Sequence, residues 1–319
     1  MTRCCRDATE RRVATAFAPS SVGNVGVGFD LLGHAVVALG DRVTVRRIDE
    51  PTVRICPDEA GTIPTDPAEN TAGAGLLRLV RDRGLSFGFE VSVQKGIPLG
   101  SGMGGSAASA AAAIVAASAL LPEPLSEPDL LQYGMYGEEV ASGSYQADNL
   151  APCLLGGLVL ARPSYPPDVV RIPVPASLHC VIVLPQLRVD TRDARRVLPR
   201  ELPLPTHVTQ AGNLAGVIAG CCLGDLELIA RSLEDVLVEP HRAPLVRGFD
   251  AVKRAAREAG ALGCSLSGSG PSLFAWCDGM AAGEEIRERM VEAFAAAGVS
   301  ARGWISPIDA PGARVEHVE

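Results

Sequence analysis

Lysine is almost absent from this chain of 319 residues. Only Lys95 and Lys253 occur among the 29 basic residues, and all the others are arginines. Because 37 residues are acidic, the formal net charge is −8, which argues against nonspecific binding to nucleic acid. We therefore expect any bound phosphate to be held mainly by backbone amides, arginine and a metal ion.

Long apolar runs, metal-binding motifs and paired cysteines are missing as well. The most apolar run, residues 106–121, is shorter than the roughly 20 residues that span a membrane, and it predicts a buried helix. The nine cysteines form no CxxC pair and no HExxH motif occurs, so no zinc site is expected. The N-terminal residues also lack the apolar core of a signal peptide. These absences predict a cytoplasmic protein with reduced thiols and with neither membrane nor nucleic acid as partner.

The remaining pattern predicts an α+β protein of two domains, the number expected for this length. A proline-rich segment at residues 162–168 places the boundary, which gives domains 13–164 and 165–319. A glycine-rich polar loop is expected at residues 19–33. Strands are predicted at residues 13–18, 36–48, 53–56, 87–94, 156–161, 169–174, 178–184, 261–267, 272–277 and 300–306. Helices are predicted at residues 69–83, 106–121, 129–141, 191–198, 208–222, 226–234, 245–259 and 282–297.

The densest cluster of glycine and serine lies at residues 98–109, PLGSGMGGSAAS, directly before an alanine-rich helix. Glycine permits positive φ and leaves the backbone N–H groups uncovered. The first turn of a helix adds further unpaired N–H groups and a partial positive charge. This segment therefore predicts a pocket for a phosphate group.

Three kinds of glycine loop compete for this segment. A Walker loop needs a lysine that is absent here. The spacing Gly100-x-Gly102-x-x-Gly105 matches the dinucleotide fingerprint, but that fold needs a strand after the helix, and here a second helix is predicted. A purely structural turn would need only one glycine, whereas this loop has four.

Two segments resemble a known family. PLGSGMGGSAAS resembles the central PxxxGLGSSAA motif of the GHMP kinases, the family of galactokinase, homoserine kinase and mevalonate kinase. GCSLSGSGPS, residues 263–272, resembles their third motif, which packs near the phosphate loop. The resemblance implies a two-domain α+β fold with ATP and substrate in the cleft between the domains.

Four more segments resemble the homoserine kinase branch. They are APSSVGNVGVGFDLLG (18–33), SGSYQADNLAPCLLGG (142–157), TRDARRVLP (191–199) and EPHRAPLVRGF (239–249). The resemblance implies a homodimer that phosphorylates L-homoserine with ATP for threonine synthesis. Another small-molecule kinase of the family, or a catalytically silent ligand sensor on the same fold, stays open as an alternative. One departure is Gln146, which stands where the branch has histidine.

The resemblance also assigns the substrate contacts. Arg195 and Arg242 would bind the carboxylate of homoserine, since a guanidinium binds a carboxylate through two hydrogen bonds. Asp30 would bind the ammonium group, and Asn24 would hydrogen-bond the substrate. The alternative for Asn24 and Asp30 is a pair of local turns in a glycine-rich loop. Gln146 is expected to hydrogen-bond the substrate without transferring a proton, because an amide does not titrate near neutral pH.

The nucleotide and metal contacts are implied in the same way. Ser106 and Glu138 would hold Mg²⁺, which prefers hard oxygen ligands. Asn70 would contact adenine, with a plain helix cap as the alternative. Lys95 would contact phosphate. The full set expected at ATP is Asn70, Lys95, Pro98, Gly100, Ser101, Gly102, Met103, Gly104, Gly105, Ser106 and Ala107.

Catalysis is expected to proceed without a general base. Related kinases such as mevalonate kinase have an aspartate at the position of Asn149, and an amide cannot accept a proton as a carboxylate does. Asn149 would therefore orient the substrate hydroxyl, while Glu138 and Ser106 act through the metal. Asp148 is expected to support the loop.

Overall fold

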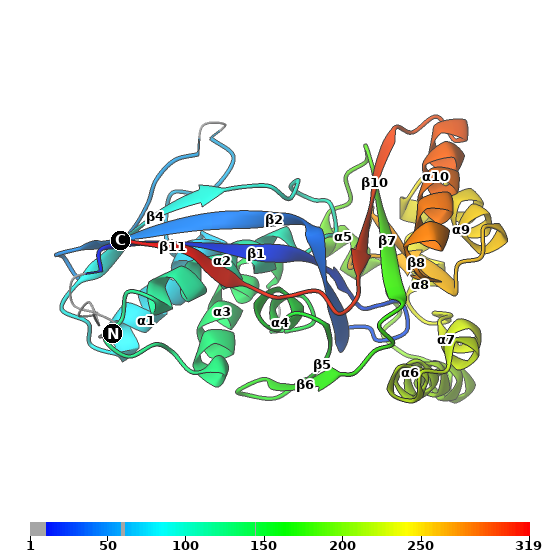
Figure 1. Cartoon of the computed structure of the whole chain (residues 1–319), viewed down its shortest axis with the longest axis horizontal. Coiled ribbons are helices and arrows are strands. Elements are labelled where there is room, and N and C mark those ends of the chain that lie inside the picture. Colours follow the sequence, from blue (N-terminus) through cyan, green and yellow to red (C-terminus); the bar gives the residue numbers. More distant parts are fainter. Residues whose placement is uncertain (1–10, 59–60, 144) are drawn as a thin grey trace, which may run out of the picture.

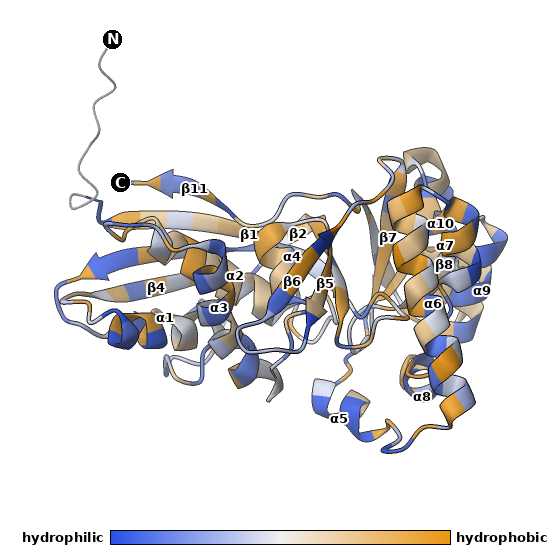
Figure 2. Cartoon of the chain, turned by 90° about the horizontal axis from the view of Figure 1, so that it is seen from below, coloured by the Kyte–Doolittle hydropathy of each residue, from blue (hydrophilic) through white to orange (hydrophobic). Residues whose placement is uncertain are grey.

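Two β-sheets with their covering helices lie side by side in the computed structural model (Figure 1). The structure describes residues 11–58, 61–143 and 145–319. Figure 2 shows helices α1 and α3 at one end of the molecule and helices α9 and α10 at the other. The fold is therefore built from two α+β parts, as the sequence predicts.

The first sheet has seven strands in the order β11-β1-β2-β4-β3, with β5 paired to β2 and β6 paired to β5. All neighbours are antiparallel except β3 and β4. Its strands are β1 (Val13–Gly23), β2 (Leu32–Ile48), β3 (Val53–Ile55), β4 (Gly88–Gln94), β5 (Leu158–Arg162), β6 (Asp168–Ile172) and β11 (Arg314–Val318).

Helix α2 is the centre of the first part. It packs against β1 and β2 and is surrounded by the other three helices, so nearly every residue from Ala107 onward is buried. Its many alanines permit this close packing, because a methyl side chain lets helices and strands approach from all sides. The helices of this part are α1 (Thr71–Asp82), α2 (Gly105–Ser118), α3 (Glu127–Ser142) and α4 (Leu150–Leu155).

The second sheet is antiparallel, in the order β10-β7-β9-β8, and α9 and α10 pack against it. Its strands are β7 (Leu178–Pro185), β8 (Gly263–Leu266), β9 (Leu273–Asp278) and β10 (Ala301–Pro307). The remaining helices are α5 (Thr191–Arg196), α6 (Leu204–Leu223), α7 (Leu226–Ser232), α8 (Glu239–Arg242), α9 (Phe249–Glu258) and α10 (Met280–Ala296), with a 3₁₀ turn η2 (Ala243–Leu245).

A buried pair joins the two sheets. The indole Nε1 of Trp276 on β9 donates to Nε2 of His34 on β2 at 3.2 Å. The other ring nitrogen of His34, Nδ1, lies 3.0 Å from the carbonyl oxygen of Ala35, so Nδ1 carries the proton. Burial lowers the pKa of His34 to about 4, and the ring is neutral. This contact helps to fix the position of one sheet against the other.

Most predicted elements are confirmed, but some differ from the sequence analysis. β1 continues through residues 19–23, which were expected to lie in the loop. The short helices α4 and α8 and the edge strand β11 were not predicted. β6 and β11, both beyond the boundary predicted at residue 164, pair within the first sheet. The division into domains 13–164 and 165–319 stays a prediction.

The seven cysteines of the described chain are free thiols, and Cys4 and Cys5 lie outside the described residues. No helix within the described ranges is long and apolar enough to cross a membrane.

Candidate active site

A polar cavity lies between the two parts and receives residues from both. The glycine-rich loop before α2 forms one side, and the loop after β1 and the start of α4 form another. Helices α5 and α8 and the loop after β8 close it from the second part. The lining residues are Asn24, Phe29, Asp30, Pro98, Leu99, Gly100, Ser101, Gly102, Met103, Gly104, Gly105, Ser106, Ala107, Glu138, Gln146, Asp148, Asn149, Thr191, Arg195, Arg242, Gly268 and Ser269.

The glycine-rich loop has a backbone that requires glycine. Gly100, Gly102 and Gly104 have φ values of 68°, 74° and 65°, which other residues rarely adopt. Gly104 is the N-cap of α2, and no side chain in the described part of the chain caps this helix end. The N–H groups of the first turn are therefore available to an anion in the cavity.

A second loop holds the glycine-rich loop in place. Ser267 Oγ donates to the carbonyl of Gly102, and Ser272 Oγ donates to that of Ser101, both at 2.7 Å. A Cβ on Gly102 would lie 2.4 Å from the carbonyl oxygen of Gly270, so the two loops are in direct backbone contact. This confirms that the segment at residues 263–272 packs against the glycine-rich loop.

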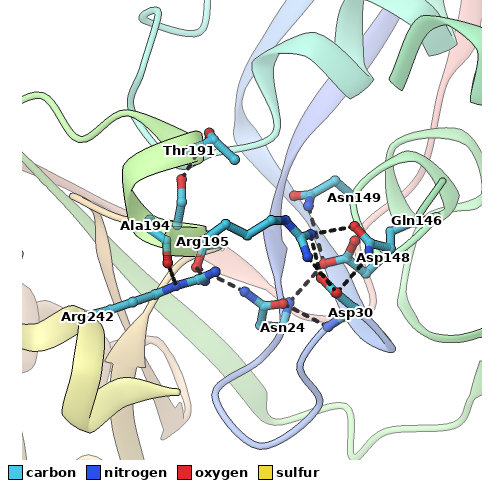
Figure 3. Close-up of polar contacts among 11 residues, drawn as sticks. Asn24, Asp30, Gln146, Asp148, Asn149, Thr191, Ala194, Arg195 and Arg242 are labelled. Atoms are coloured by element: carbon cyan, nitrogen blue, oxygen red, sulfur yellow. Dashed lines mark hydrogen bonds and ion pairs between the residues drawn. The ribbon is translucent and has the colours of Figure 1, made fainter. Parts of the chain in front are cut away.

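A charged cluster also lines the cavity, and Figure 3 shows its side chains pointing toward one another. Arg195 points from α5 to Asp30 and makes two hydrogen bonds to its carboxylate, at 3.0 and 3.1 Å. Gln146 bridges the pair, because its Nε2 donates to Asp30 at 2.6 Å and its Oε1 accepts from Arg195 at 2.5 Å. The side chains of Arg195 and Asp30 remain 35% and 22% exposed, so a ligand can reach them.

Arg242 lies behind this cluster and is only 3% exposed. Its Nε donates to the carbonyl of Ala194 at 2.9 Å, and its Nη1 donates to that of Gly268 at 3.1 Å. Burial, followed by the charge of Arg195, lowers the pKa of Arg242. The guanidinium carbons of Arg242 and Arg195 lie 5.2 and 5.6 Å from the centre of the Phe29 ring. The fold thus brings two arginines to one end of the cavity.

Asn24 organises the loop that carries Asp30. It has a φ of 68°, and its Oδ1 accepts from the backbone N–H of Asp30 at 2.9 Å. Its Nδ2 donates to the carbonyl of Gly268 at 2.9 Å. The first of these hydrogen bonds spans six residues, so it is not the short local turn given as the alternative, and Asn24 also lines the cavity.

Asp148 and Asn149 line the cavity at the start of α4, where Asn149 is the N-cap. Asn149 Oδ1 accepts from Ser21 Oγ at 2.9 Å, and Asn149 Nδ2 donates to Asp148 Oδ2 at 3.3 Å. Asp148 also accepts from the backbone N–H of Asn24 at 3.2 Å, which supports the loop as expected. Burial and the nearby charge of Asp30 raise the pKa of Asp148 to about 7.

Glu138 on α3 and Ser106 in the first turn of α2 line the cavity next to the glycine-rich loop. Glu138 is 8% exposed, and burial followed by the charge of Asp148 raises its pKa to about 8. A divalent cation would offset this unfavourable burial, and a carboxylate with a hydroxyl is a suitable donor pair for Mg²⁺. Among the described residues no group of three or more metal-ligating side chains occurs, so further ligands would come from phosphate or water.

Comparison with known proteins agrees with this geometry. Residues 70–157 match the model of the GHMP kinases N terminal domain, and residues 217–296 match that of the GHMP kinases C terminal domain. The chain is 52% identical over 304 residues to homoserine kinase of Xylella fastidiosa (strain 9a5c), which covers 95% of this chain and 94% of that protein.

This chain belongs to the homoserine kinase family. A homoserine kinase of Chloroherpeton thalassium is 42% identical over 94% of this chain and 98% of its own length. The crystal structure of homoserine kinase from Cytophaga hutchinsonii has a TM-score of 0.92 at 42% identity and covers 99% of both chains. Mevalonate kinase of L. major, at 14% identity and a TM-score of 0.66, shares the fold.

Two residues expected at the nucleotide, Lys95 and Asn70, have contacts within the fold, and their contact with ATP stays a prediction. Lys95 is not part of the cavity lining, because its ammonium binds the carboxylate of Asp41, the carbonyl of Gly105 at 2.8 Å and Ser109 Oγ at 3.1 Å. Lys95 therefore supports the glycine-rich loop through these contacts. Asn70 caps α1 through its Oδ1 and donates to the carbonyl of Pro64 at 2.7 Å, so the cap is present, and the contact with adenine stays a prediction.

The sequence analysis missed several residues that build the site. Asp41 is fully buried and accepts from the backbone N–H groups of Gly96 and Ile97 at 3.0 and 3.1 Å. Ser21 binds Asn149. Ser267 and Ser272 lie in the motif at residues 263–272, but the sequence analysis predicted no role for either residue. That motif was the one sequence signal that could have identified them.

Proposed function

We propose that this member of the homoserine kinase family transfers the γ-phosphoryl group of ATP to the hydroxyl of L-homoserine. The observation that carries the proposal is one cavity with two unlike ends. One end offers the backbone N–H groups of a helix start, which suit phosphate. The other end, Asp30 with Arg195 and Arg242, suits a small zwitterion.

Homoserine would bind by replacing contacts within the charged cluster. Its carboxylate would accept from Arg195 and Arg242, and its ammonium would donate to Asp30. The ion pair of Arg195 with Asp30 holds both groups in position before the substrate arrives, at 3.0 Å. Gln146, which already bonds both partners, would keep their separation as the substrate enters.

The phosphates of ATP would lie against the glycine-rich loop and the start of α2. Glu138 and Ser106 would hold a magnesium ion, which neutralises phosphate charge when bound. The Asn149 amide would hold the hydroxyl oxygen of homoserine in line with the γ-phosphorus. The new bond joins that oxygen to the γ-phosphorus, and the bond from the γ-phosphorus to the bridging oxygen breaks, so that ADP leaves. The hydroxyl proton passes to an oxygen of the transferred phosphoryl group and not to a side-chain base.

Phosphorus NMR of reactions with ATP, magnesium and each candidate acceptor tests this proposal. With L-homoserine, a phosphomonoester signal is expected to grow in step with ADP, and mevalonate, galactose and shikimate are expected to give none. A phosphomonoester with another acceptor alone would assign a different kinase activity. Tight ATP binding without any product would favour a ligand sensor.

The same resemblance supports three further parts of the proposal. The reaction would serve threonine synthesis, the protein would be cytoplasmic, and it would form a homodimer. Sedimentation velocity at several protein concentrations measures the last of these directly.

A further inference from the structure

Ser21 connects the two ends of the cavity from inside the fold. It lies on β1 and is fully buried. Its hydroxyl donates to Asn149 Oδ1 at 2.9 Å, and its backbone N–H donates to the carbonyl of Met103 in the glycine-rich loop at 3.1 Å. One residue therefore contacts both the amide expected at the substrate hydroxyl and the loop expected at the phosphates.

The two ends of the Asn149 amide have different partners. Oδ1 faces the Ser21 hydroxyl, and Nδ2 faces the Asp148 carboxylate at 3.3 Å. If the amide were reversed, its oxygen would face the carboxylate of Asp148, and the hydrogen bond between them would be lost when that carboxylate is ionised. In the observed orientation Nδ2 has two hydrogens, of which Asp148 takes one, and Asn149 lines the cavity.

Close packing leaves these groups little freedom. A Cβ on Gly104 would lie 2.0 Å from Ser21 Oγ and 3.1 Å from Asn149 Oδ1. On the other side, a Cβ on Gly23 would lie 2.5 Å from Asn149 Nδ2. The serine hydroxyl, the amide and the loop backbone are therefore in contact only because two neighbouring positions lack a side chain.

We propose that Ser21 is a positioning residue that fixes the orientation of the Asn149 amide and its distance from the glycine-rich loop. The inference rests on the proposed role of Asn149 at the hydroxyl of homoserine. Ser21 acts through Asn149 and contacts no substrate, so its removal lowers kcat and leaves both KM values nearly unchanged.

Ser21→Ala and its neighbour Ser20→Ala form a matched pair. Ser20 is also fully buried on β1, but its hydroxyl donates to the carbonyl of Val36 at 2.9 Å, away from the site. Both variants lose one buried hydrogen bond, so similar losses of thermal stability are expected. The kcat of Ser21→Ala is expected to fall by about 10-fold, and that of Ser20→Ala by less than about 2-fold. Equal kcat values for the two variants would overturn the inference.

A double-mutant cycle with Asn149→Ala separates this inference from the proposed function. Asn149→Ala alone is expected to lower kcat, and adding Ser21→Ala is expected to lower it no further. If the two losses multiply, Ser21 does not act through Asn149. If Asn149→Ala leaves kcat unchanged, the proposed role of Asn149 fails, and the inference fails with it.

Ser21→Cys, assayed with a reductant because Cys153 lies beside Ser21, supplies the same test if Ser21→Ala does not fold. A thiol is larger than a hydroxyl and a weaker donor, so both the kcat and the melting temperature of this variant are expected to fall. Unchanged kcat in the folded variant would contradict the positioning role.

Discussion

The two ends of the cavity are built from different parts of the polypeptide. The end proposed for homoserine uses side chains: Asp30, Gln146 and Arg195 bond one another, and Arg242 lies behind them. The end proposed for phosphate uses backbone: three glycines with positive φ lead into an uncapped helix start. The chain's lysine nearest this loop, Lys95, is bound to Asp41 beneath it.

This difference predicts how each end responds to mutation. At the side-chain end, truncation removes a charged hydrogen bond and lowers affinity for one substrate group. At the backbone end, the contacts are made by N–H groups, so there is no binding side chain to truncate. Here an added methyl group is expected to lower the affinity. Glu138 and Ser106 are the exceptions, because they are side chains proposed to act at the phosphate end.

Glu138→Gln is expected to lower turnover more than any other substitution. It is expected to make the folded protein more stable at high pH. Loss of a charged metal ligand should lower kcat by at least about 1,000-fold. Because burial raises the pKa of Glu138 to about 8, the folded protein keeps this proton at pH values where the unfolded chain has lost it. The free energy of unfolding of the ligand-free parent is therefore expected to fall as pH rises from about 5 to 8. That of Glu138→Gln should fall less over the same range.

Thermal melts of both proteins from pH 5 to pH 8, beside steady-state kinetics, check this prediction. The exposed neighbour Glu139→Gln is the control, with near-parental turnover and melting expected. Parental turnover in Glu138→Gln would contradict the proposed role of Glu138 as a metal ligand.

Lys95→Met tests whether the phosphate end uses a lysine. Its loss would leave the fully buried Asp41 without its cation, and breaking a buried pair costs about 3–5 kcal/mol of folding free energy. Urea denaturation should show this loss, with the KM for ATP changed by less than about 3-fold in the folded fraction. A KM for ATP raised more than 10-fold with parental stability would instead support the predicted contact of Lys95 with phosphate.

Gln146→His is expected to have the smallest effect on activity. It tests whether the side-chain end needs an amide at this position. Histidine stands at this position in the related motif, and its ring can donate and accept as the amide does. We expect kcat/KM for homoserine within about 5-fold of the parent near pH 8, where the ring is neutral. Complete loss of activity in a folded variant would show that the amide itself is required.

The side-chain end could be predicted from the sequence because its residues lie within short motifs. Asp30, Gln146, Asn149, Arg195 and Arg242 all line the cavity. The supporting residues could not be found in this way, because their roles depend on strand register. Asp41 reaches the loop only because β2 runs beside β4, and Ser21 reaches Asn149 across 128 positions.

The missing elements of the fold have equally physical causes. β11, RVEHV, has four exposed residues and no apolar face, so its pairing with β1 leaves no local pattern. α4 and α8 are too short, with 6 and 4 residues, to show helical periodicity. The return of the C-terminus to the first sheet is a tertiary property that no window of sequence contains.

Titration calorimetry with Arg195→Ala and Gly100→Ala tests the division of the cavity most directly. Gly100 has a φ of 68°, and its added Cβ would meet only the flexible side chain of Arg188, at 3.3 Å, so this variant should fold. Arg195→Ala is expected to lose about 10- to 100-fold in affinity for homoserine and less than 3-fold for ATP. Gly100→Ala is expected to show the reverse, with about a 10-fold loss for ATP. If each variant loses affinity for both substrates equally, the two ends are not separate binding sites, and the account is contradicted.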